Sequence, residues 1–240
     1  ARPIAALLSG PAAGVVAAAG AAREVGWAKA DLITVDVGGT SADVGVVQKG
    51  DCVLSSEEHI ANFPLITPTI AVSSVGAGGG SIIWLDETGA LKVGPRSVGA
   101  EPGPACYGDG KLPALADAFV AAGWLEDGHV LGGRIRLQAS QARASLAPIA
   151  EQLGLDVERV ADGAIAVAIA VMAAETSNVI ARRGVDAETF TLVAFGGAGP
   201  LIGAMLADEV NIRRLLIPPT PGALSAVGAA YADVQGDLIA

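Results

Sequence analysis

The amino-acid sequence predicts a mixed α/β fold in which a mixed sheet is flanked by helices. Three observations favour this fold: a β-rich meander near the start of the chain, long helical segments in its middle, and a strand–helix–strand–helix order near its end. The 240 residues are enough for a substantial core, and no internal repeat or low-complexity linker divides them. We therefore predict one domain over residues 1–240.

The first predicted element is a helix of small residues. Ser9, Gly10 and Pro11 make a cap-like start, the run 12–25 is rich in Ala and Gly, and Gly26 ends it. Small side chains on this surface would allow another backbone to approach closely. Because no Met begins the chain and no signal-type segment follows, we expect the sequence to start inside a longer protein or to be a processed piece.

An antiparallel meander is predicted over residues 31–56. The run DLITVDV (31–37) is typical of a buried strand, and a Gly-Gly-Thr turn leads to a second strand at 43–48. A Lys-Gly-Asp turn then leads to a third strand at 52–56. Connections this short join neighbouring antiparallel strands, so we do not expect a βαβ unit here.

The middle of the chain predicts a hairpin, a long loop and three helices. Residues 81–93 are typical of a hairpin, and the Gly/Pro-rich stretch 94–113 lacks periodicity, which indicates a long surface or active-site loop. Helices are predicted at 115–122, 139–153 and 157–183. The last of them ends in two Arg residues and a Gly, as a helix C-terminus often does.

The C-terminal part alternates between strands and helices. We predict a buried strand at 190–195, a helix at 201–209, a strand at 213–217 that two prolines stop, and a final helix at 222–232.

Composition and charge exclude several classes of protein. Hydrophobic residues make up 52% of the chain, which is too much apolar surface for a disordered protein. Lys and Arg number 15 against 25 Asp and Glu, so the formal charge of −10 and the lack of a basic cluster argue against nucleic-acid binding. The apolar stretches 12–22 and 163–174 are shorter than the ~18 residues of a membrane span, which favours tightly packed helices and no membrane partner.

Cysteine usage gives no sign of a disulfide framework or a zinc site. Cys52 and Cys106 lie 54 positions apart and form no CxxC pair. A reducing cytoplasm is therefore the expected location.

The strongest chemical motif is DVGGTSAD, residues 36–43. Asp36 ends a strand, Gly38 and Gly39 make the turn, and Thr40, Ser41 and Asp43 follow. Glycines let backbone N–H groups close on phosphate oxygens, and hydroxyls add donors. Asp36 would hold Mg²⁺ through water, because Mg²⁺ dehydrates reluctantly. An ordinary β-hairpin turn also accepts Gly-Gly, but it does not explain two hydroxyls and two carboxylates.

A second glycine-rich motif follows a predicted strand and opens a helix. Gly196, Gly197 and Gly199 would let a backbone or a ligand approach closely, and a helix N-terminus favours an anion or a polar ring edge. Alone the motif is unspecific, since it is not GxGxxG and the chain has no GxxxxGK[ST] loop. The similar stretch 76–81 could present donors to a phosphate or an oxyanion, or could be a tight strand connection.

Taken in order, these pieces resemble the actin-like ATPase superfamily, which has a ribonuclease H-like fold and includes sugar kinases and Hsp70 chaperones. The resemblance implies a first connecting helix at 10–26, a second phosphate loop at 36–43, an adenosine loop at 196–200 and a second connecting helix at 222–232. The superfamily's first phosphate loop, which would lie upstream, is not in this sequence. The implied fold is one ribonuclease H-like ATPase lobe of the actin, Hsp70 and sugar-kinase type.

A narrower resemblance is to the hydantoinase A/5-oxoprolinase family, which also includes acetone and acetophenone carboxylase subunits. It covers nearly the whole chain. Six ordered motifs carry it: SGPAAGVV (9–16), DVGGTSADV (36–44), VGAGGGSI (75–82), GAEPGPACYG (99–108), FGGAGPL (195–201) and PPTPGALSAVG (218–228).

The family resemblance implies an ATP- and Mg²⁺-dependent hydrolase that phosphorylates a small cyclic amide, hydantoin or 5-oxoproline-like, before water opens the ring. It implies catalytic roles for Asp36 and Asp43, with Asp36 at the metal, and nucleotide contacts from Gly38, Gly39, Thr40, Ser41, Gly196, Gly197 and Gly199. It also implies a separate N-terminal domain and a hydantoinase B-type subunit or domain as partners, so that the isolated chain would be inactive. A ketone carboxylase subunit and a non-catalytic nucleotide-binding lobe remain alternatives, and a homo-oligomer stays open.

The chain departs from the family pattern at three positions. Ala71 and Ser73 stand where the family often has Asp and His, and Ile202 stands where it often has His. Any metal or acid–base role of those family residues is therefore lost here.

For the other polar residues the sequence allows both a structural and a functional interpretation. Asp117 could be a site carboxylate or an acid of a helix first turn. The sequence shows no general base paired with Cys106, and nucleophilic catalysis by a cysteine would need one. Surface or turn positions are expected for His59 and His129, and Glu175 and Asn178 share a helix face that is either solvated or beside the nucleotide.

Overall fold

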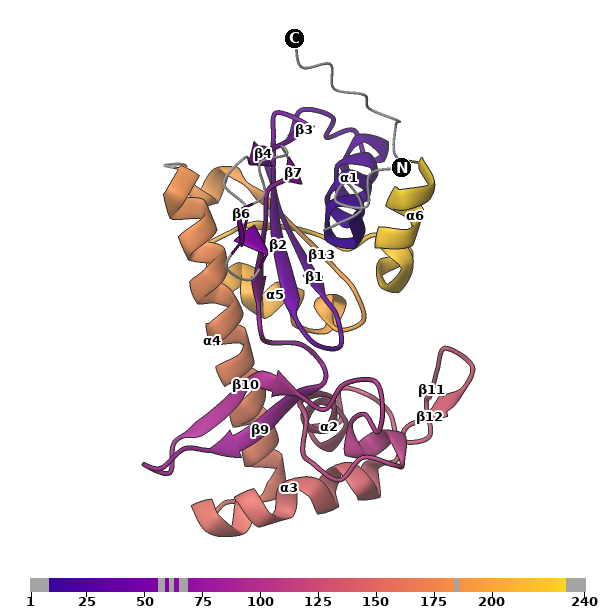
Figure 1. Cartoon of the computed structure of the whole chain (residues 1–240), viewed down its shortest axis with the longest axis vertical. Helices are drawn as coiled ribbons and strands as arrows, with labels where there is room; N and C mark the ends of the chain where they lie inside the picture. Colours follow the sequence, from indigo (N-terminus) through magenta and orange to yellow (C-terminus); the bar gives the residue numbers. More distant parts are fainter. Residues whose placement is uncertain (1–8, 56–58, 61–62, 65–68, 184–185, 232–240) are drawn as a thin grey trace.

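The computed structural model describes residues 9–55, 59–60, 63–64, 69–183 and 186–231 (Figure 1). Its helices are α1 (Ser9–Glu24), α2 (Leu115–Ala121), α3 (Ala139–Leu153), α4 (Val157–Arg183), α5 (Gly199–Glu209) and α6 (Leu224–Tyr231). Its strands are β1 (Leu32–Val37), β2 (Ala42–Gln48), β3 (Asp51–Cys52), β4 (Leu54–Ser55), β5 (His59–Ile60), β6 (Phe63–Pro64), β7 (Thr69–Ile70), β8 (Val72–Val75), β9 (Ser81–Leu85), β10 (Leu91–Ser97), β11 (Val130–Leu131), β12 (Ile135–Arg136), β13 (Thr191–Phe195) and β14 (Arg214–Leu216). Short 3₁₀ turns occur at Ala105–Tyr107, Ala187–Thr189 and Pro221–Ala223.

The main sheet has the strand order β14-β13-β1-β2-β3, with β8 also paired to β2. β13 runs parallel to β1 and to β14, whereas β2 runs antiparallel to β1, to β3 and to β8. Numbered along the chain, the five strands of the main path lie in the order 5-4-1-2-3 with the second strand reversed. This is the topology of a ribonuclease H-like lobe, so the predicted mixed sheet and the predicted meander are confirmed.

Helices cover both faces of this sheet, and the alternation of β1 assigns its residues to the two faces. Ile33, Val35 and Val37 belong to a large core with residues of α4 and α5. Leu32 packs instead with α1, and Thr34 and Asp36 share its face. β1 is therefore buried on both sides and carries Asp36 toward α1 and α6.

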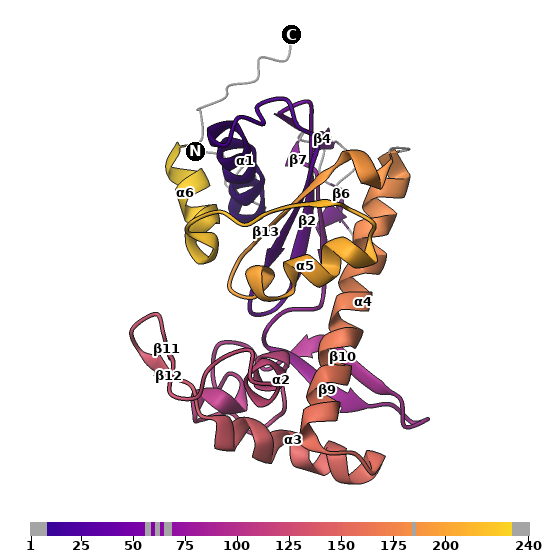
Figure 2. The same ribbon diagram turned by 180° about the vertical axis from the view of Figure 1, so that it is seen from behind.

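A second group of elements lies beside this sheet and is joined to it by α4 (Figures 1 and 2). It contains the β9–β10 hairpin, α2, α3 and the small β11–β12 ribbon. α4 packs against α2, α3 and β10 along one part of its length and against α5, β2 and β8 along another. We call the two groups the sheet lobe and the hairpin lobe.

α4 has the length and composition of a membrane-crossing helix, although the apolar stretch 163–174 by itself is shorter than a span. An 18-residue stretch within Val157–Arg182 has a mean hydropathy of 1.8, and half of that stretch is buried inside the structure. Its apolar side chains, among them Val160, Ile165 and Met172, form the core that connects the two lobes.

The element bounds correct the sequence predictions in three places. The third strand of the meander is only Asp51–Cys52, because Leu54–Ser55 pairs with β7 instead of β2. β10 extends to Ser97, so the Gly/Pro-rich loop begins later than position 94 and contains a 3₁₀ turn. The final helix begins at Leu224, after a separate 3₁₀ turn. The other predicted helices and strands are present, and their bounds either match, as for α3 and α4, or differ by one to three residues.

Candidate functional site

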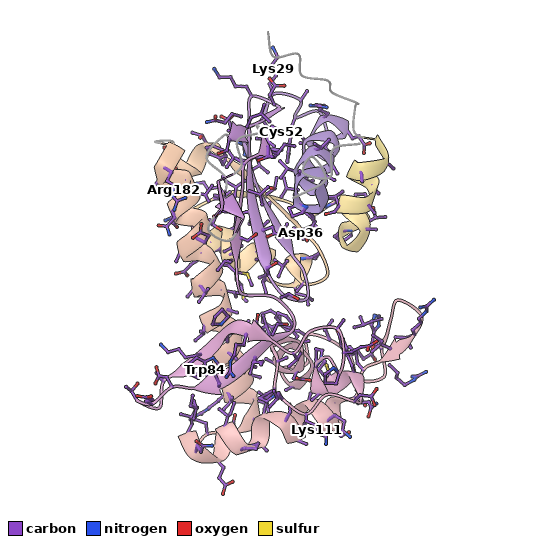
Figure 3. All side chains as sticks on the ribbon, in the orientation of Figure 1. Lys29, Asp36, Cys52, Trp84, Lys111 and Arg182 are labelled. Carbon is purple, nitrogen blue, oxygen red and sulfur yellow. The ribbon has the colours of Figure 1, made fainter. Side chains whose placement is uncertain are left out.

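One row of residues crosses the sheet on the face that α1 and α6 cover. In the strand register Asp36 pairs with Phe195 on one side and with Asp43 on the other, and Asp43 pairs with Ser74. Paired residues of neighbouring strands point to the same face. The two carboxylates that the sequence analysis singled out are therefore cross-strand neighbours, and Figure 3 shows Asp36 at the sheet beside these helices.

Asp36 is half-buried and has one hydrogen-bond donor from a distant part of the chain. Ser225 Oγ donates to Asp36 Oδ2 at 2.9 Å. Burial raises the pKa of Asp36 above its ordinary value, the Ser225 hydroxyl opposes that shift, and the neighbouring Asp43 adds to it. A carboxylate in this setting is poised toward a cation, because a positive charge would offset both the burial and the nearby acid.

The loop between β1 and β2 presents free backbone donors. Gly38 N–H donates to Ser41 O at 3.0 Å and so closes the turn. Within the described parts of the chain, the N–H groups of Gly39, Thr40 and Ser41 donate to no acceptor, and Gly39 and Thr40 are exposed. Consecutive unpaired N–H groups at a turn form an anion-binding concavity.

The glycine-rich stretch 76–81 packs against this loop and donates backbone hydrogen bonds to it. Gly79 N–H donates to Gly38 O at 2.9 Å, and Gly80 N–H donates to Gly39 O. A Cβ on Gly78 would lie 2.7 Å from Gly38 O and 2.8 Å from Ser41 N, so the close approach requires glycine there. The N–H groups of Gly79 and Gly80 are thus used for the fold, which favours the tight-connection reading of this stretch.

The second glycine motif, which follows β13, lies at the same edge of the sheet as the loop between β1 and β2. Ala198 N–H donates to Val37 O at 3.0 Å, which ties the turn after β13 to the end of β1. Gly196 has a φ of +84°, and a Cβ on it would overlap Asp36 Oδ1 and the carbonyl of Val37. Gly197 is exposed and Gly199 begins α5. The structure therefore places Gly196 beside Asp36, whereas Gly199 lies against Val35 and Val37 of β1 and Gly197 has no neighbour within 4 Å of a Cβ.

Asp43 is held by its neighbour on β8. Ser74 Oγ donates a short hydrogen bond to Asp43 Oδ1. This contact fixes a carboxylate one strand away from Asp36.

The two Ala/Gly-rich helices pack on each other beside this row. A Cβ on Gly228 of α6 would overlap the carbonyl oxygen of Ala13 in α1, so the two backbones are in contact. A Cβ on Gly14 would lie 2.8 Å from Ser225 Oγ and 2.8 Å from the Phe195 ring. The close helix approach predicted from small residues is confirmed, and it brings Ser225 to Asp36.

Comparison with known proteins assigns this arrangement to a family. The family model described as hydantoinase/oxoprolinase matches residues 1–237. The chain belongs to the hydantoinase/oxoprolinase family. It is 40% identical over 240 residues to the caprolactamase subunit alpha of Pseudomonas jessenii, a match that covers 99% of this chain and 34% of that protein.

Solved structures of family members have the same fold over most of the chain. The crystal structure of the ATP-dependent caprolactamase from Pseudomonas jessenii matches with a TM-score of 0.81 at 40% identity, covering 94% of this chain and 32% of that one. The nucleotide-free structure of acetone carboxylase matches with a TM-score of 0.85 at 30% identity, covering 93% of this chain and 32% of that one. The chain spans about a third of the length of these hydantoinase/oxoprolinase relatives.

Two positions where this family member departs from the expected pattern lie on the opposite face of the sheet from Asp36. Ser73 alternates with Ser74 along β8 and donates a short hydrogen bond to Glu175 Oε1 of α4. Ile202 is fully buried in the core around α4 and α5. Glu175 is therefore separated from Asp36 by the sheet, and its partner is Ser73, while Asn178 is exposed.

Asp117 and Cys106 form a separate buried cluster in the hairpin lobe. Asp117 accepts backbone N–H bonds from Cys106 at 2.6 Å, Ala114 at 2.8 Å and Ala105 at 3.2 Å. Burial raises the pKa of the Cys106 thiol. Burial also raises the pKa of Asp117, although the hydrogen bonds that its carboxylate accepts oppose this shift. Asp117 thus fixes the Gly/Pro-rich loop on the start of α2, and the buried thiol is protonated and unsuited to nucleophilic attack.

Two other polar residues outside the sheet lobe are exposed. They are Asp109, in the Gly/Pro-rich loop, and His129, which follows a turn, as the sequence predicts. The side chain of His59 lies outside the described residues. Among the residues that the structure does describe, no three His, Cys, Asp or Glu side chains gather in a way that would hold a metal ion by themselves.

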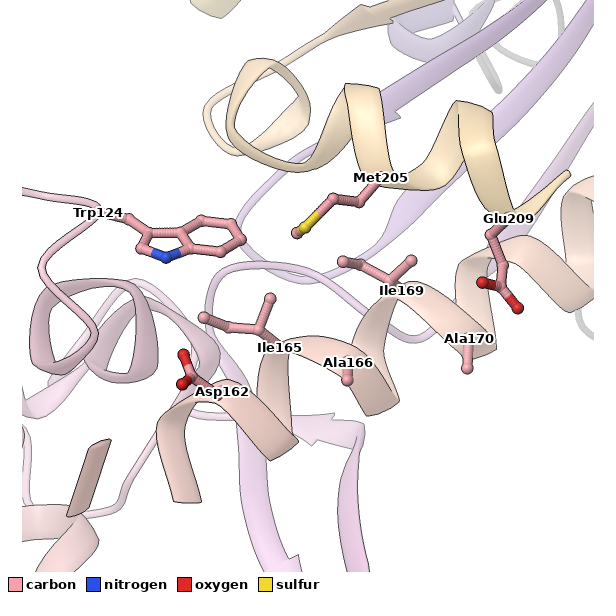
Figure 4. Close-up of a pocket in the computed structure, with 8 residues that line it drawn as sticks. All are labelled: Trp124, Asp162, Ile165, Ala166, Ile169, Ala170, Met205 and Glu209. Carbon is pink, nitrogen blue, oxygen red and sulfur yellow. The ribbon is translucent and has the colours of Figure 1, made fainter. Parts of the chain in front are cut away.

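A groove of about 480 Å³ lies between α4 and α5, away from Asp36 (Figure 4). Trp124, Ile165, Ile169 and Met205 give it apolar walls, and Asp162 and Glu209 lie toward its two ends. It belongs to the other face of the sheet and is no part of the Asp36 site.

Sequence reasoning missed Ser225. Its signal was a hydroxyl within the motif PPTPGALSAVG, in an otherwise apolar stretch of a helix, but no local pattern connects position 225 with position 36.

Proposed function

We propose that this chain is the nucleotide-binding lobe of an ATP-dependent hydrolase that activates a small cyclic amide. One observation carries the proposal: Asp36 lies beside a loop whose three consecutive N–H groups, at Gly39, Thr40 and Ser41, have no acceptor among the described residues. The chain that carries this loop belongs to the hydantoinase/oxoprolinase family. Unpaired backbone donors next to a carboxylate suit a magnesium-bound polyphosphate, because the donors contact phosphate oxygens and the acid faces the cation.

The residues present fit ATP and Mg²⁺. Gly38, Gly39, Thr40 and Ser41 would hold the β- and γ-phosphates, and Gly196, Gly197 and Gly199 would pack against the adenosine. Asp36 would hold Mg²⁺ through water and orient the attacking group, with Asp43 supporting the loop. The described residues offer no cluster of three metal ligands, so phosphate oxygens and water would have to supply the other ligands, as is usual for Mg²⁺. Mg²⁺ would neutralise the charge that develops on the transferred phosphoryl group.

The chemistry proposed for the whole enzyme has two steps. The γ-phosphoryl group of ATP is transferred to the oxygen of the ring amide, and ADP leaves. Water then adds to the activated ring carbon, and the ring C–N bond breaks to give a free amine and an acyl phosphate. A second water molecule hydrolyses the acyl phosphate to the open-chain acid and inorganic phosphate. This chain would supply half of the nucleotide site, while an N-terminal domain would supply the other phosphate loop and a hydantoinase B-type subunit or domain would complete ring opening.

The caprolactamase relative supports this assignment in two ways. It is 40% identical to the chain over 240 aligned residues and is named a caprolactamase, with ATP dependence stated for its structure. Its designation as subunit alpha fits a requirement for a partner subunit.

Ketone carboxylation is the second candidate, because the acetone carboxylase structure matches the fold with a TM-score of 0.85. The first step, phosphorylation of a carbonyl oxygen, would be shared by both reactions. The substrate and the second step would differ.

The test is ADP release by the full-length protein with its partner subunit, measured with a panel of lactams, hydantoins and ketones. We expect at least one lactam or hydantoin to stimulate ADP release and to yield the ring-opened acid. Stimulation by ketones that requires bicarbonate would instead favour carboxylation. Nucleotide binding without stimulation by any carbonyl compound would favour a non-catalytic lobe, in line with Ala71, Ser73 and Ile202.

A further inference from the structure

Ser225 connects the last helix of the fold to Asp36. The two residues are 189 positions apart in the sequence, and Ser225 Oγ donates to Asp36 Oδ2 at 2.9 Å in a half-buried setting. Within the described residues, no other side chain donates to this carboxylate.

The surroundings of Ser225 are built for this contact. Gly14 leaves space for the hydroxyl, since a Cβ there would lie 2.8 Å from Ser225 Oγ. Gly228 lets α6 contact the backbone of α1, one turn further along the helix. The segment before α6 is fixed as well, because Gly196 N–H donates to Pro221 O at 2.9 Å. The same stretch of chain therefore holds both Asp36 and the turn that carries Gly196.

The hydrogen bond selects one orientation of the carboxylate. Rotation about the terminal bond of an Asp side chain is broad when nothing restrains it. With Oδ2 bound by Ser225, Oδ1 faces Gly196, where even a Cβ would overlap it. The Asp36 carboxylate is thus held in one orientation between α6 and the turn that carries Gly196. It does not rotate freely beside the loop of Gly39 and Thr40.

We propose that Ser225 is a positioning residue for Asp36 in phosphoryl transfer. It holds the carboxylate in the orientation that the Mg²⁺-nucleotide needs, and it links that orientation to the seating of α6 on α1. The inference rests on the proposed function, since it requires that Asp36 acts on the nucleotide. Pre-set orientation affects the reacting state more than the binding of the substrate, so its loss lowers kcat with little change in KM.

The test is a variant series in the full-length protein, assayed for ATP turnover with the most stimulating substrate. We expect Ser225→Ala to lower kcat by about 10- to 30-fold, the scale of a lost hydrogen bond to a charged group, and to change the KM for ATP by less than about threefold. Ser225→Thr keeps the hydroxyl and is expected to recover kcat to within about threefold of the wild type. Ser225→Cys keeps the volume with only a weak donor, and we expect it to resemble Ser225→Ala.

Two controls separate positioning from a general loss of structure. Ser140→Ala removes an exposed serine of α3 in the hairpin lobe and is expected to leave turnover unchanged. Binding of a fluorescent ATP analogue to each variant reports the nucleotide site without turnover, and we expect an affinity within about threefold of the wild type for the Ser225 variants. If Ser225→Ala does not fold, the Cys and Thr pair makes the same comparison with the packing retained.

A double-mutant cycle decides whether Ser225 acts through Asp36. If it does, Ser225→Ala has little further effect in the Asp36→Asn background. The inference is overturned if Ser225→Ala and Ser225→Cys turn over at the wild-type rate, if Thr fails to restore kcat in a folded protein, or if the two losses multiply fully. If Asp36→Asn itself leaves turnover unchanged, the site assignment in the proposed function fails together with this inference. If only the Ser225 variants are without effect, this inference fails alone.

Discussion

Asp36 in the sheet lobe and Asp117 in the hairpin lobe are both carboxylates whose pKa burial raises, yet their surroundings differ. Asp117 is fully buried and accepts three backbone N–H bonds from its own loop. Asp36 is half-buried and, among the described residues, accepts one hydrogen bond, from a hydroxyl, and lies beside backbone donors without an acceptor. An acid whose hydrogen bonds the fold satisfies completely suits a structural role, whereas one left partly unsatisfied beside free donors suits the ligand-binding role proposed for Asp36.

The largest effect is expected from removal of the charge on Asp36. Asp36→Asn keeps the shape of the side chain, and we expect ATP turnover of the full-length protein to fall by about 10²–10³-fold, the scale of a lost electrostatic contact at a reacting group. Stability is expected to stay the same or rise slightly, because burial disfavours the charge that is removed. Steady-state ADP release and thermal unfolding measure the two effects, and wild-type turnover would contradict the assignment.

Asp117 should show the reverse pattern. Asp117→Ala leaves the N–H groups of Ala105, Cys106 and Ala114 buried without an acceptor, so we expect a loss of at least about 3 kcal/mol in the free energy of unfolding. Asp109→Ala, an exposed acid in the same loop, is the matched control and is expected to be neutral. Urea unfolding provides the measurement. If Asp117→Ala were as stable as its control but slow in turnover, the two acids would have the same kind of role.

The glycine turn beside Asp36 gives a smaller effect that tests its packing. Gly196→Ala puts a methyl group against Asp36 Oδ1 at a φ of +84°, and we expect it to lower the free energy of unfolding by about 1–3 kcal/mol. Gly197→Ala is the matched control for stability, because no atom lies within 4 Å of a Cβ at that position. Equal unfolding midpoints for the two variants would show that Gly196 is not confined by the carboxylate.

The sequence predicted the parts of the site that are local and missed the part that is not. Asp36, Gly38, Gly39, Thr40 and Ser41 follow one another in the chain, so a single strand and turn bring them together. The order of strands and helices and the small residues of α1 and α6 were likewise visible in local patterns.

What local patterns do not contain is the pairing of distant elements. Ser225 reaches Asp36 only because α6 packs on α1, and Ser73 reaches Glu175 only because α4 crosses the sheet on its other face. Asp117 was left open between two roles for the same reason, since two of its three donors come from the turn at Ala105–Tyr107.

Asp86 extends the comparison to a carboxylate whose pKa shifts in the opposite direction, and it carries the smallest prediction. It lies at the turn of the β9–β10 hairpin, where its Oδ1 accepts the Thr88 hydroxyl at 2.6 Å and the N–H groups of Thr88 at 2.9 Å and Ala90 at 3.0 Å. The Thr88 hydroxyl, followed by the Ala90 N–H, lowers the pKa of Asp86 from 3.8 to about 2. The contrast with Asp117 follows from exposure, because water already solvates Asp86 and burial cannot cancel its hydrogen bonds.

A lowered pKa makes a definite prediction for stability against pH. The folded protein binds fewer protons at Asp86 than the unfolded chain between pH 3.8 and about 2, so stability falls as the pH is lowered through that window. Asp86→Asn removes this titration, and its urea midpoint should approach that of the wild type as the pH falls from 5 toward 2.5. Thr88→Val, which deletes the hydroxyl donor, should show part of the same convergence. A difference between wild type and Asp86→Asn that stays constant over this range would mean that the hairpin turn does not depend on the charge of Asp86.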